Sequence, residues 1–258
     1  IEKILYFYFV LAITIIAAFR PIGLDPDSLG YSYLIMSGLY QEKVELSFSI
    51  IVDFWKLFIP LEYVPRMVIV SYAVIQICIL RLALDNYTKY KFEAFLLFFL
   101  MLYSISTLTQ IRIGVASTIF FWAIHDILHR NTFTYFAKIS LAISFHSMGI
   151  IFLFFYFIKP KKINRIFYLL VFPIGILILQ FVGFFKDIVK DHTADLLPLF
   201  IGQKVYSYLS IEEQAISTFN IWFLFVVLIY YLVLLNLKKL DQDFILYVKV
   251  LGIGILLY

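Results

Sequence analysis

Long apolar runs, separated by short groups of charged residues, extend along the whole chain. Because a helix needs roughly 20 apolar residues to cross a bilayer, this pattern predicts an all-α polytopic membrane helix bundle with about eight or nine spans in this portion. The predicted spans are residues 4–19, 64–82, 94–110, 112–128, 132–145, 147–158, 166–185, 218–236 and 243–258.

Composition supports the same class of protein. Of the 258 residues, 63% are hydrophobic and 15% are charged, whereas soluble domains are about half apolar and about a quarter charged. We therefore expect residues 1–258 to form a single integral membrane domain, without a soluble module. The chain starts with Ile1 rather than Met and ends in an apolar run, so we expect it to be part of a longer chain.

Net charge and cysteine content exclude two further classes. The net charge is only +4, and the basic residues lie in predicted loops, so we expect no nucleic acid partner. The single cysteine, Cys78, lies inside an apolar run. It therefore provides neither a disulfide nor a thiolate metal site.

The basic connections predict the topology, because short loops rich in lysine and arginine stay cytoplasmic. All of them can be cytoplasmic together only if residues 131–158 cross twice, or enter and return as a short re-entrant hairpin with His146 at its turn. Each arm of that hairpin has about 12 to 14 residues, or roughly 20 Å of helix. The basic connections are Arg81 with Lys89 and Lys91, then Arg130, residues 159–165, and Lys238 with Lys239.

Alternate counting from a cytoplasmic Lys3 places the unusual polar groups on the outer face. These groups are the long segments 20–63 and 186–217, the turn at residues 110–112, and His146. In the first segment, Asp25-Pro26-Asp27-Ser28 predicts a turn that leads into an amphipathic helix through Tyr40. We expect a second piece, residues 48–58, to lie on or dip into the membrane.

Arg112 and His146 are the polar side chains that most need an explanation at membrane depth. The guanidinium of Arg112 matches phosphate oxygens in a bidentate fork, so it is a candidate anion clamp for a lipid diphosphate. The alternative is an arginine that reaches the headgroups. His146 can exchange a proton near neutral pH, although a membrane histidine also serves as a hydrogen bonder between helices.

Two other motifs carry weaker signals. Asp25 and Asp27 have a spacing that can hold a divalent metal against a diphosphate, but capping of the following helix is the commoner use. We expect no metal and no cofactor, and a general-base or acceptor-orienting role is the alternative. His125 and His129 resemble a zinc helix, yet no third ligand is evident on that predicted cytoplasmic side, so we interpret them as an interfacial helix end.

Short motifs in the first two thirds of the chain resemble a known family. Residues 107–116 and 145–150 resemble the Gln-x-Arg-x-Gly-x-Ala and Phe-His-x-Ser pattern of the EpsG-like branch of Wzy polysaccharide polymerases. The upstream residues Phe19-Arg20-Pro21, Gly23-x-Asp25, Tyr31 and Glu45-x-x-Phe48 are similar to that family's N-terminal signature. The resemblance covers residues 15–160, and the rest of the chain agrees in hydropathy.

The resemblance implies an integral-membrane glycosyltransferase with a GT-C-like fold. Such an enzyme polymerises undecaprenyl-diphosphate-linked oligosaccharide repeat units on the periplasmic or outer face of the bacterial cytoplasmic (inner) membrane. The product would be O-antigen, capsule or exopolysaccharide. The implied partners are these lipid-linked oligosaccharides, membrane lipid, a Wzz-type chain-length regulator and a flippase.

The expected site follows from the same motifs. We expect Arg112 to stabilise the leaving diphosphate, and either His146 or one of the carboxylates to take the acceptor proton. The expected catalytic residues are Arg112, His146, Asp25 and Asp27, and the expected substrate-binding residues are Arg20, Tyr31, Glu45, Gln110, Tyr206 and Tyr208.

Three other functions remain open at this point. A flippase or transporter of lipid-linked oligosaccharide would use the same anion-binding cavity, but would need polar groups along a path to both faces. A membrane O-acyltransferase would use His146. An intramembrane protease would use His125 and His129.

Overall fold

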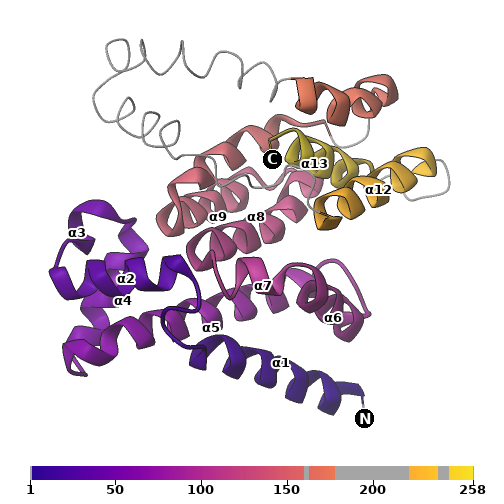
Figure 1. Ribbon diagram of the computed structural model, residues 1–258. Coiled ribbons are helices and arrows are strands. Elements are labelled where there is room, and N and C mark those ends of the chain that lie inside the picture. Colours follow the sequence, from indigo (N-terminus) through magenta and orange to yellow (C-terminus); the bar gives the residue numbers. More distant parts are fainter. Residues whose placement is uncertain (1, 160–162, 178–220, 238–243, 258) are drawn as a thin grey trace, which may run out of the picture. The chain divides into compact units, whose positions relative to one another are not determined.

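The computed structural model describes residues 2–159, 163–177, 221–237 and 244–257, and all regular secondary structure in these residues is helical (Figure 1). The predicted all-α class is therefore confirmed. The helices are α1 (Glu2–Phe19), α2 (Pro26–Ser37), α3 (Tyr40–Lys43), α4 (Leu46–Lys56), η1 (Leu61–Tyr63), α5 (Val64–Asp85), α6 (Lys91–Met101), α7 (Tyr103–Ser106), α8 (Ile111–His129), α9 (Thr132–Phe145), η2 (Ser147–Phe157), an unlabelled helix Arg165–Leu177, α12 (Ile221–Leu235) and α13 (Phe244–Leu257).

The chain divides into two compact units, Ile1–Ile158 and Lys159–Tyr258. The first unit is built around α5, which packs against α1, α4 and α8. Figure 1 shows α2, α3 and α4 grouped at one end of α5. Every candidate site residue described by the structure belongs to this first unit.

Two helices in the described residues are long and apolar enough to cross a membrane, Leu61–Asp85 and Ile111–His129. The other apolar helices have 10–17 residues, and they include Ile4–Phe19 and Ser147–Phe157. Helices thus lie within the described parts of the predicted apolar runs, whereas the number of spans stays a prediction. Three runs, 166–185, 218–236 and 243–258, extend beyond the described residues.

The predicted span 94–110 is not one continuous helix, and the sequence itself indicates a helix break at residues 104–109 within it. Its first part is α6, which ends at Met101, and the short α7 follows after Leu102, whose φ of −120° and ψ of −23° interrupt the helix. Residues 107–110 are not helical, and α8 begins at Ile111. The interruption places Arg112 in the first turn of a helix rather than in the middle of one.

The predicted hairpin around His146 is present. α9 ends at Phe145, His146 is extended with φ −156° and ψ 127°, and the 3₁₀ helix η2 returns along α9. The Tyr135 hydroxyl donates to the carbonyl of Phe152 across the two arms. At about 1.5 Å per residue α9 spans about 21 Å, and at about 2.0 Å per residue the shorter η2 spans about 22 Å, so the arms match in length.

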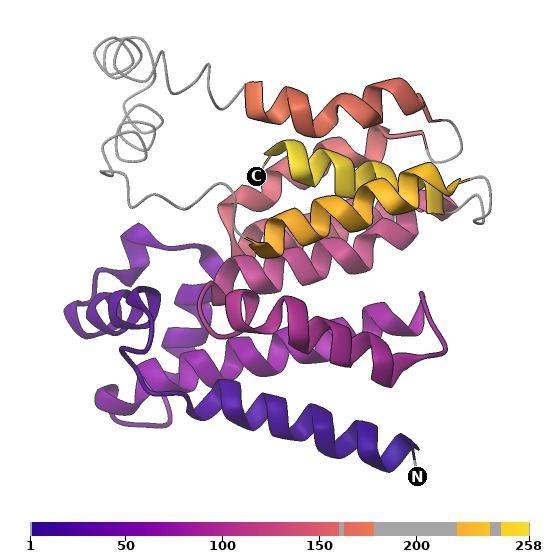
Figure 2. The same ribbon diagram turned by 45° about the vertical axis from the view of Figure 1, so that its right-hand side comes forward.

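The second unit contains Arg165–Leu177, α12 and α13 (Figure 2). Its core includes Tyr168, Val171, Val227 and Tyr230. The buried Tyr230 hydroxyl donates to the carbonyl of Tyr168 at 2.6 Å, which joins α12 to the first of these helices.

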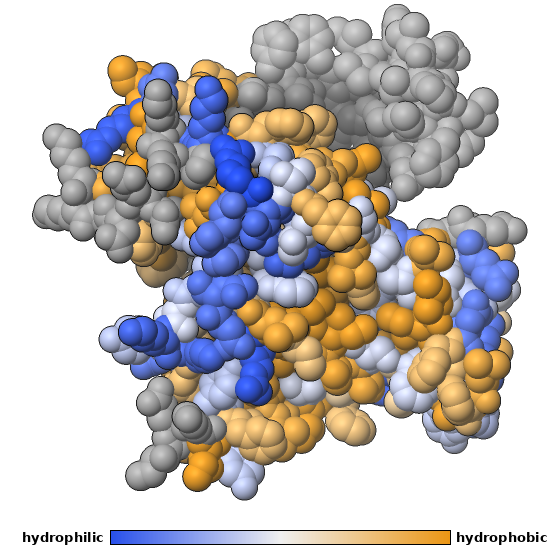
Figure 3. All heavy atoms as spheres, turned by 180° about the vertical axis from the view of Figure 1, so that it is seen from behind, coloured by the Kyte–Doolittle hydropathy of each residue, from blue (hydrophilic) through white to orange (hydrophobic). Residues whose placement is uncertain are grey.

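Apolar side chains reach the surface over wide areas of the protein. Figure 3 shows one such face, on which hydrophobic residues cover broad patches and many of the hydrophilic residues form a band that runs down the face. On α1, Leu5, Phe7 and Ile16 are each more than half exposed. Large apolar faces of this kind are expected where a helix contacts lipid.

Candidate functional site

The segment that precedes α4 brings the candidate residues together. The prediction of a turn at residues 25–28 is correct, because Asp25 is the N-cap of α2 and its carboxylate accepts from the backbone N–H of Ser28 at 2.9 Å. α2 ends at Ser37, earlier than the predicted Tyr40, because the next residue, Gly38, adopts a left-handed φ of 77°. α3 follows, and Glu45 then stands immediately before α4.

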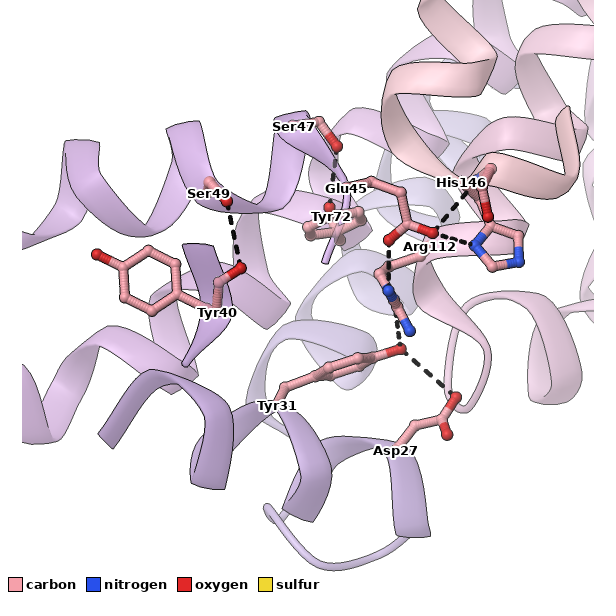
Figure 4. Close-up of polar contacts among 10 residues, drawn as sticks. Asp27, Tyr31, Tyr40, Glu45, Ser47, Ser49, Tyr72, Arg112 and His146 are labelled. Carbon is pink, nitrogen blue, oxygen red and sulfur yellow. Dashed lines mark hydrogen bonds and ion pairs between the residues drawn. The ribbon is translucent and has the colours of Figure 1, made fainter. Parts of the chain in front are cut away.

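Glu45 lies at the centre of the site (Figure 4). Its Oε1 accepts from His146 Nδ1 at 2.9 Å and from the backbone N–H of Ser147 at 3.2 Å. Its Oε2 forms an ion pair with Arg112 Nη1. One carboxylate therefore joins the start of α8 to the turn between α9 and η2.

Arg112 is held on a second side by α2. Its Nε donates to the Tyr31 hydroxyl at 3.3 Å, and its guanidinium carbon lies 5.1 Å from the centre of the Tyr31 ring. The Tyr31 hydroxyl in turn donates to Asp27 at 3.4 Å. Asp27, Tyr31, Arg112, Glu45 and His146 thus form one continuous polar cluster, named here the Glu45 cluster.

Aromatic rings pack beside the Glu45 cluster. Tyr31 packs against Phe48, Phe48 against Tyr72, and Tyr72 against Phe145, with ring centres 5.4 to 6.2 Å apart. Phe48 and Tyr72 are fully buried. Because these rings come from α2, α4, α5 and α9, they fix the four helices that carry or flank the charged groups.

The Glu45 cluster is only partly exposed. The exposed fraction of the side chain is 23% for Arg112, 14% for Glu45 and 20% for His146. Burial alone would raise the pKa of Glu45, but the hydrogen bond from His146 and the charge of Arg112 outweigh it and lower this pKa to about 2. Burial raises the pKa of Tyr31 to about 12, against the effect of Arg112. Glu45 is therefore a carboxylate and Tyr31 a neutral phenol at neutral pH.

Arg20 and Asp25 form a second ion pair, which is almost completely buried. Arg20 Nη2 lies 3.4 Å from Asp25 Oδ2, and the two side chains are 2% and 3% exposed. Arg20 Nη1 also donates to the carbonyl of Thr107 at 3.3 Å. The paired use of Asp25 and Asp27 is not seen, because one carboxylate faces Arg20 and the other faces Tyr31.

The remaining expected residues lie apart or outside the described residues. Gln110 is exposed and is the residue before α8, where its carbonyl accepts from the N–H of Gly114 at 2.8 Å. Tyr206 and Tyr208 lie outside the described residues. Their roles as substrate contacts stay predictions.

The two histidines at the other end of α8 contact each other. The rings of His125 and His129 stack with centres 4.1 Å apart, and His129 Nδ1 lies 3.0 Å from the carbonyl oxygen of His125. Asp126, between them in sequence, pairs instead with Lys138 of α9 at 2.7 Å. In the part of the chain that the structure describes, no group of three or more metal-ligating residues is found.

Sequence reasoning missed the central position of Glu45 and the presence of Arg66. The guanidinium of Arg66, near the start of α5, donates to the carbonyl of Arg20. Glu45 has no signal in hydropathy, because it lies among other polar residues of the long segment 20–63, whereas Arg66 is a charged residue at the start of the predicted apolar span 64–82. For Glu45, its place in the N-terminal motif was the available signal.

The geometry of the cluster suits a reaction in which an anion leaves and a proton is taken up. Glu45 fixes the imidazole through Nδ1, which leaves Nε2 as the ring nitrogen that can accept a proton. Among the described residues, Arg112 Nη2 has no hydrogen-bond partner, so it can bind an anion while Nη1 holds Glu45.

Comparisons with known proteins identify a family for this sequence. The sequence model described as the EpsG family matches residues 3–258. Comparisons with curated proteins and with solved structures found no match.

Proposed function

Because the chain belongs to the EpsG family, we propose that it is a membrane glycosyltransferase that polymerises lipid-linked oligosaccharide repeat units. The family comprises Wzy-like polysaccharide polymerases, and the apolar helices agree with a membrane protein. The proposed enzyme is a multi-pass protein of the GT-C class in the bacterial cytoplasmic membrane, with the Glu45 cluster facing the periplasm or exterior. Its substrates are undecaprenyl-diphosphate-linked oligosaccharides.

One observation supports this proposal above the others: Arg112 and His146, from separate helices, share the carboxylate of Glu45. In the proposed reaction a sugar hydroxyl of one repeat unit attacks the anomeric carbon of the growing chain. The bond from that carbon to the lipid diphosphate breaks, so negative charge develops on the leaving phosphate. The guanidinium of Arg112 stabilises this charge in a partly buried site.

His146 is the proposed general base, and its Nε2 takes the proton of the attacking hydroxyl. The carboxylates of Asp25 and Asp27, the alternatives considered from the sequence, already have other partners in Arg20 and Tyr31. Glu45 holds the tautomer with the proton on Nδ1 and stabilises the imidazolium that forms. Glu45 is thus a positioning residue in this mechanism.

The proposal is tested with purified protein, reconstituted in lipid and supplied with undecaprenyl-diphosphate-linked repeat units. The wild type should convert them into a ladder of longer products. Arg112→Ala should lower the rate about 100-fold or more, because a preorganised donor to developing charge is worth about 3 to 4 kcal/mol. His146→Asn should also abolish the ladder, since the amide can replace the Nδ1 donor but cannot act as a base.

Arg81→Ala is the matched control, because Arg81 is an exposed arginine at the far end of α5. It should leave the ladder unchanged. Movement of the lipid-linked substrate across the bilayer without any polymer would support the flippase alternative instead. A normal ladder from Arg112→Ala would remove the proposed clamp.

A further inference from the structure

Arg20 connects four parts of the first unit. It follows the end of α1, its side chain pairs with Asp25 at the start of α2, and it donates to the carbonyl of Thr107 in the interruption between α7 and α8. Its own carbonyl accepts from Arg66 of α5. A single arginine therefore joins α1, α2, α5 and the segment that leads into α8.

The burial of this pair differs from that of the Glu45 cluster. The side chains of Arg20 and Asp25 are 2% and 3% exposed, whereas those of Arg112 and His146 are 23% and 20% exposed. A group that binds a diphosphate or takes a proton from a sugar hydroxyl must reach the substrate. Arg20 and Asp25 are closed off from it, and each compensates the buried charge of the other.

The ion pair contacts two segments, the start of α2 and the residues before α8, and both segments carry residues of the Glu45 cluster. Asp25 caps α2, which carries Asp27 and Tyr31 two and six residues later. Thr107 starts the interruption that ends at Gln110, and Arg112 is the second residue of the helix that follows. A shift of either segment would change the distance between the Tyr31 hydroxyl and the Arg112 guanidinium.

We propose that Arg20 and Asp25 are positioning residues, which hold α2 and the start of α8 so that Tyr31 and Arg112 meet, and that neither contacts the substrate. This replaces the roles that the sequence motifs implied for the two residues. The proposal rests on the proposed function, since it assigns their effect on polymerisation to the Glu45 cluster. Asp27 is not included, because its carboxylate contacts Tyr31 directly.

A double-mutant cycle tests the proposal with Arg20→Gln, Asp25→Asn and the double variant R20Q/D25N. Gln can still donate to the Thr107 carbonyl, and Asn is a good N-cap residue for α2. Each single variant leaves one buried charge uncompensated, so its thermal midpoint in detergent should fall by roughly 5 to 15 °C. The double variant buries no charge and should recover most of that shift.

Polymer formation should follow the same cycle. Each single variant should lose about tenfold or more of the activity, and the double variant should recover at least half of the loss on a logarithmic scale. If either residue contacted the substrate, the double variant would be no more active than the worse single variant. That result, or single variants with unchanged midpoints, would overturn the proposal.

The two proposals fail in different ways. If the wild type makes no polymer, the proposed function is wrong. The thermal midpoints of the variants still show whether the ion pair of Arg20 and Asp25 holds α2 and the start of α8 together. If the wild type polymerises but the thermal midpoint of the double variant stays as low as those of the single variants, only the positioning role of Arg20 and Asp25 is wrong. Arg20→Lys provides a further check, because lysine keeps the charge but lacks the forked guanidinium that reaches both Asp25 and Thr107. This variant should therefore keep only part of the wild-type activity.

Discussion

Glu45 is the residue that contacts both Arg112 and His146 in the candidate site. Its carboxylate accepts hydrogen bonds from Arg112 and His146, which are 67 and 101 positions away in the sequence. It lies outside both helices of membrane-spanning length. A partly buried carboxylate that accepts from three donors is favoured in its ionised form, so the stability of the cluster depends on pH in a defined range.

Acid should therefore weaken the protein through Glu45. Because the folded-state pKa of Glu45 is about 2 and its ordinary value is 4.5, the stabilisation is present above pH 4.5. It is lost as the pH falls from 4.5 towards 2. We expect the thermal midpoint of the wild type in detergent to drop over this range.

Glu45→Gln should lower the midpoint at neutral pH and should show a smaller drop between pH 4.5 and 2. Glu62→Gln is the control, because Glu62 is exposed and its replacement should leave the wild-type curve in place. Parallel curves for Glu45→Gln and the wild type would contradict the ion pairs seen at Glu45.

At the scale of elements, α8 and α9 are joined at the end opposite Arg112. Asp126 and Lys138 pair at 2.7 Å, with side chains 5% and 10% exposed, and the Lys138 ammonium lies 3.9 Å from the Trp122 ring. Removing one partner should leave an uncompensated charge, so Lys138→Met should cost about 3 to 5 kcal/mol of stability. The double variant D126N/K138M should restore most of this free energy.

An exposed pair in the same unit offers the comparison. Lys91 and Asp85 are 42% and 41% exposed, and exposed pairs contribute about 1 kcal/mol or less. Lys91→Met should therefore change the thermal midpoint little. Equal effects of Lys91→Met and Lys138→Met would argue against a buried pair between α8 and α9.

The approach of α8 to the end of α7 depends on Gly114. A Cβ at this position would lie 1.9 Å from the carbonyl oxygen of Ser106, a backbone atom that cannot move away alone. Gly114→Ala should destabilise the protein by about 1 to 3 kcal/mol and should also reduce polymerisation, since the same turn carries Arg112. Ser117→Ala, on an exposed side of α8, should be neutral in both measurements.

For the whole molecule, the testable property is orientation in the membrane. Tyr63, before α5, and Tyr90, before α6, are 57% and 70% exposed. In a background with Cys78→Ser, Tyr63→Cys should react with a membrane-impermeant maleimide in intact cells. Tyr90→Cys should react only after permeabilisation. Reaction of both from outside would refute the predicted topology.

The sequence could predict the helices and the residues of interest, but not their partners. Hydropathy located α1, α5 and α8, since each is an apolar run bounded by charged residues, and the charge of the loops required a hairpin at His146. It could not show that Asp25 faces Arg20 while Asp27 faces Tyr31, because both carboxylates have the same local pattern. The interruption after Met101 was also only partly visible, since Leu102 is as apolar as its neighbours.

The return arm of the hairpin, η2, is unusually long for a 3₁₀ helix. Its 11 residues are extended as a 3₁₀ helix, and the same residues wound as an α-helix would be about 5 Å shorter. One hydrogen bond between the hydroxyls of Thr132 and Tyr156 fixes the base of the arm. Rewinding would therefore draw in the tip of the arm and move the His146 imidazole away from the Glu45 carboxylate. The contact between His146 and Glu45 therefore depends on η2 keeping its 3₁₀ form.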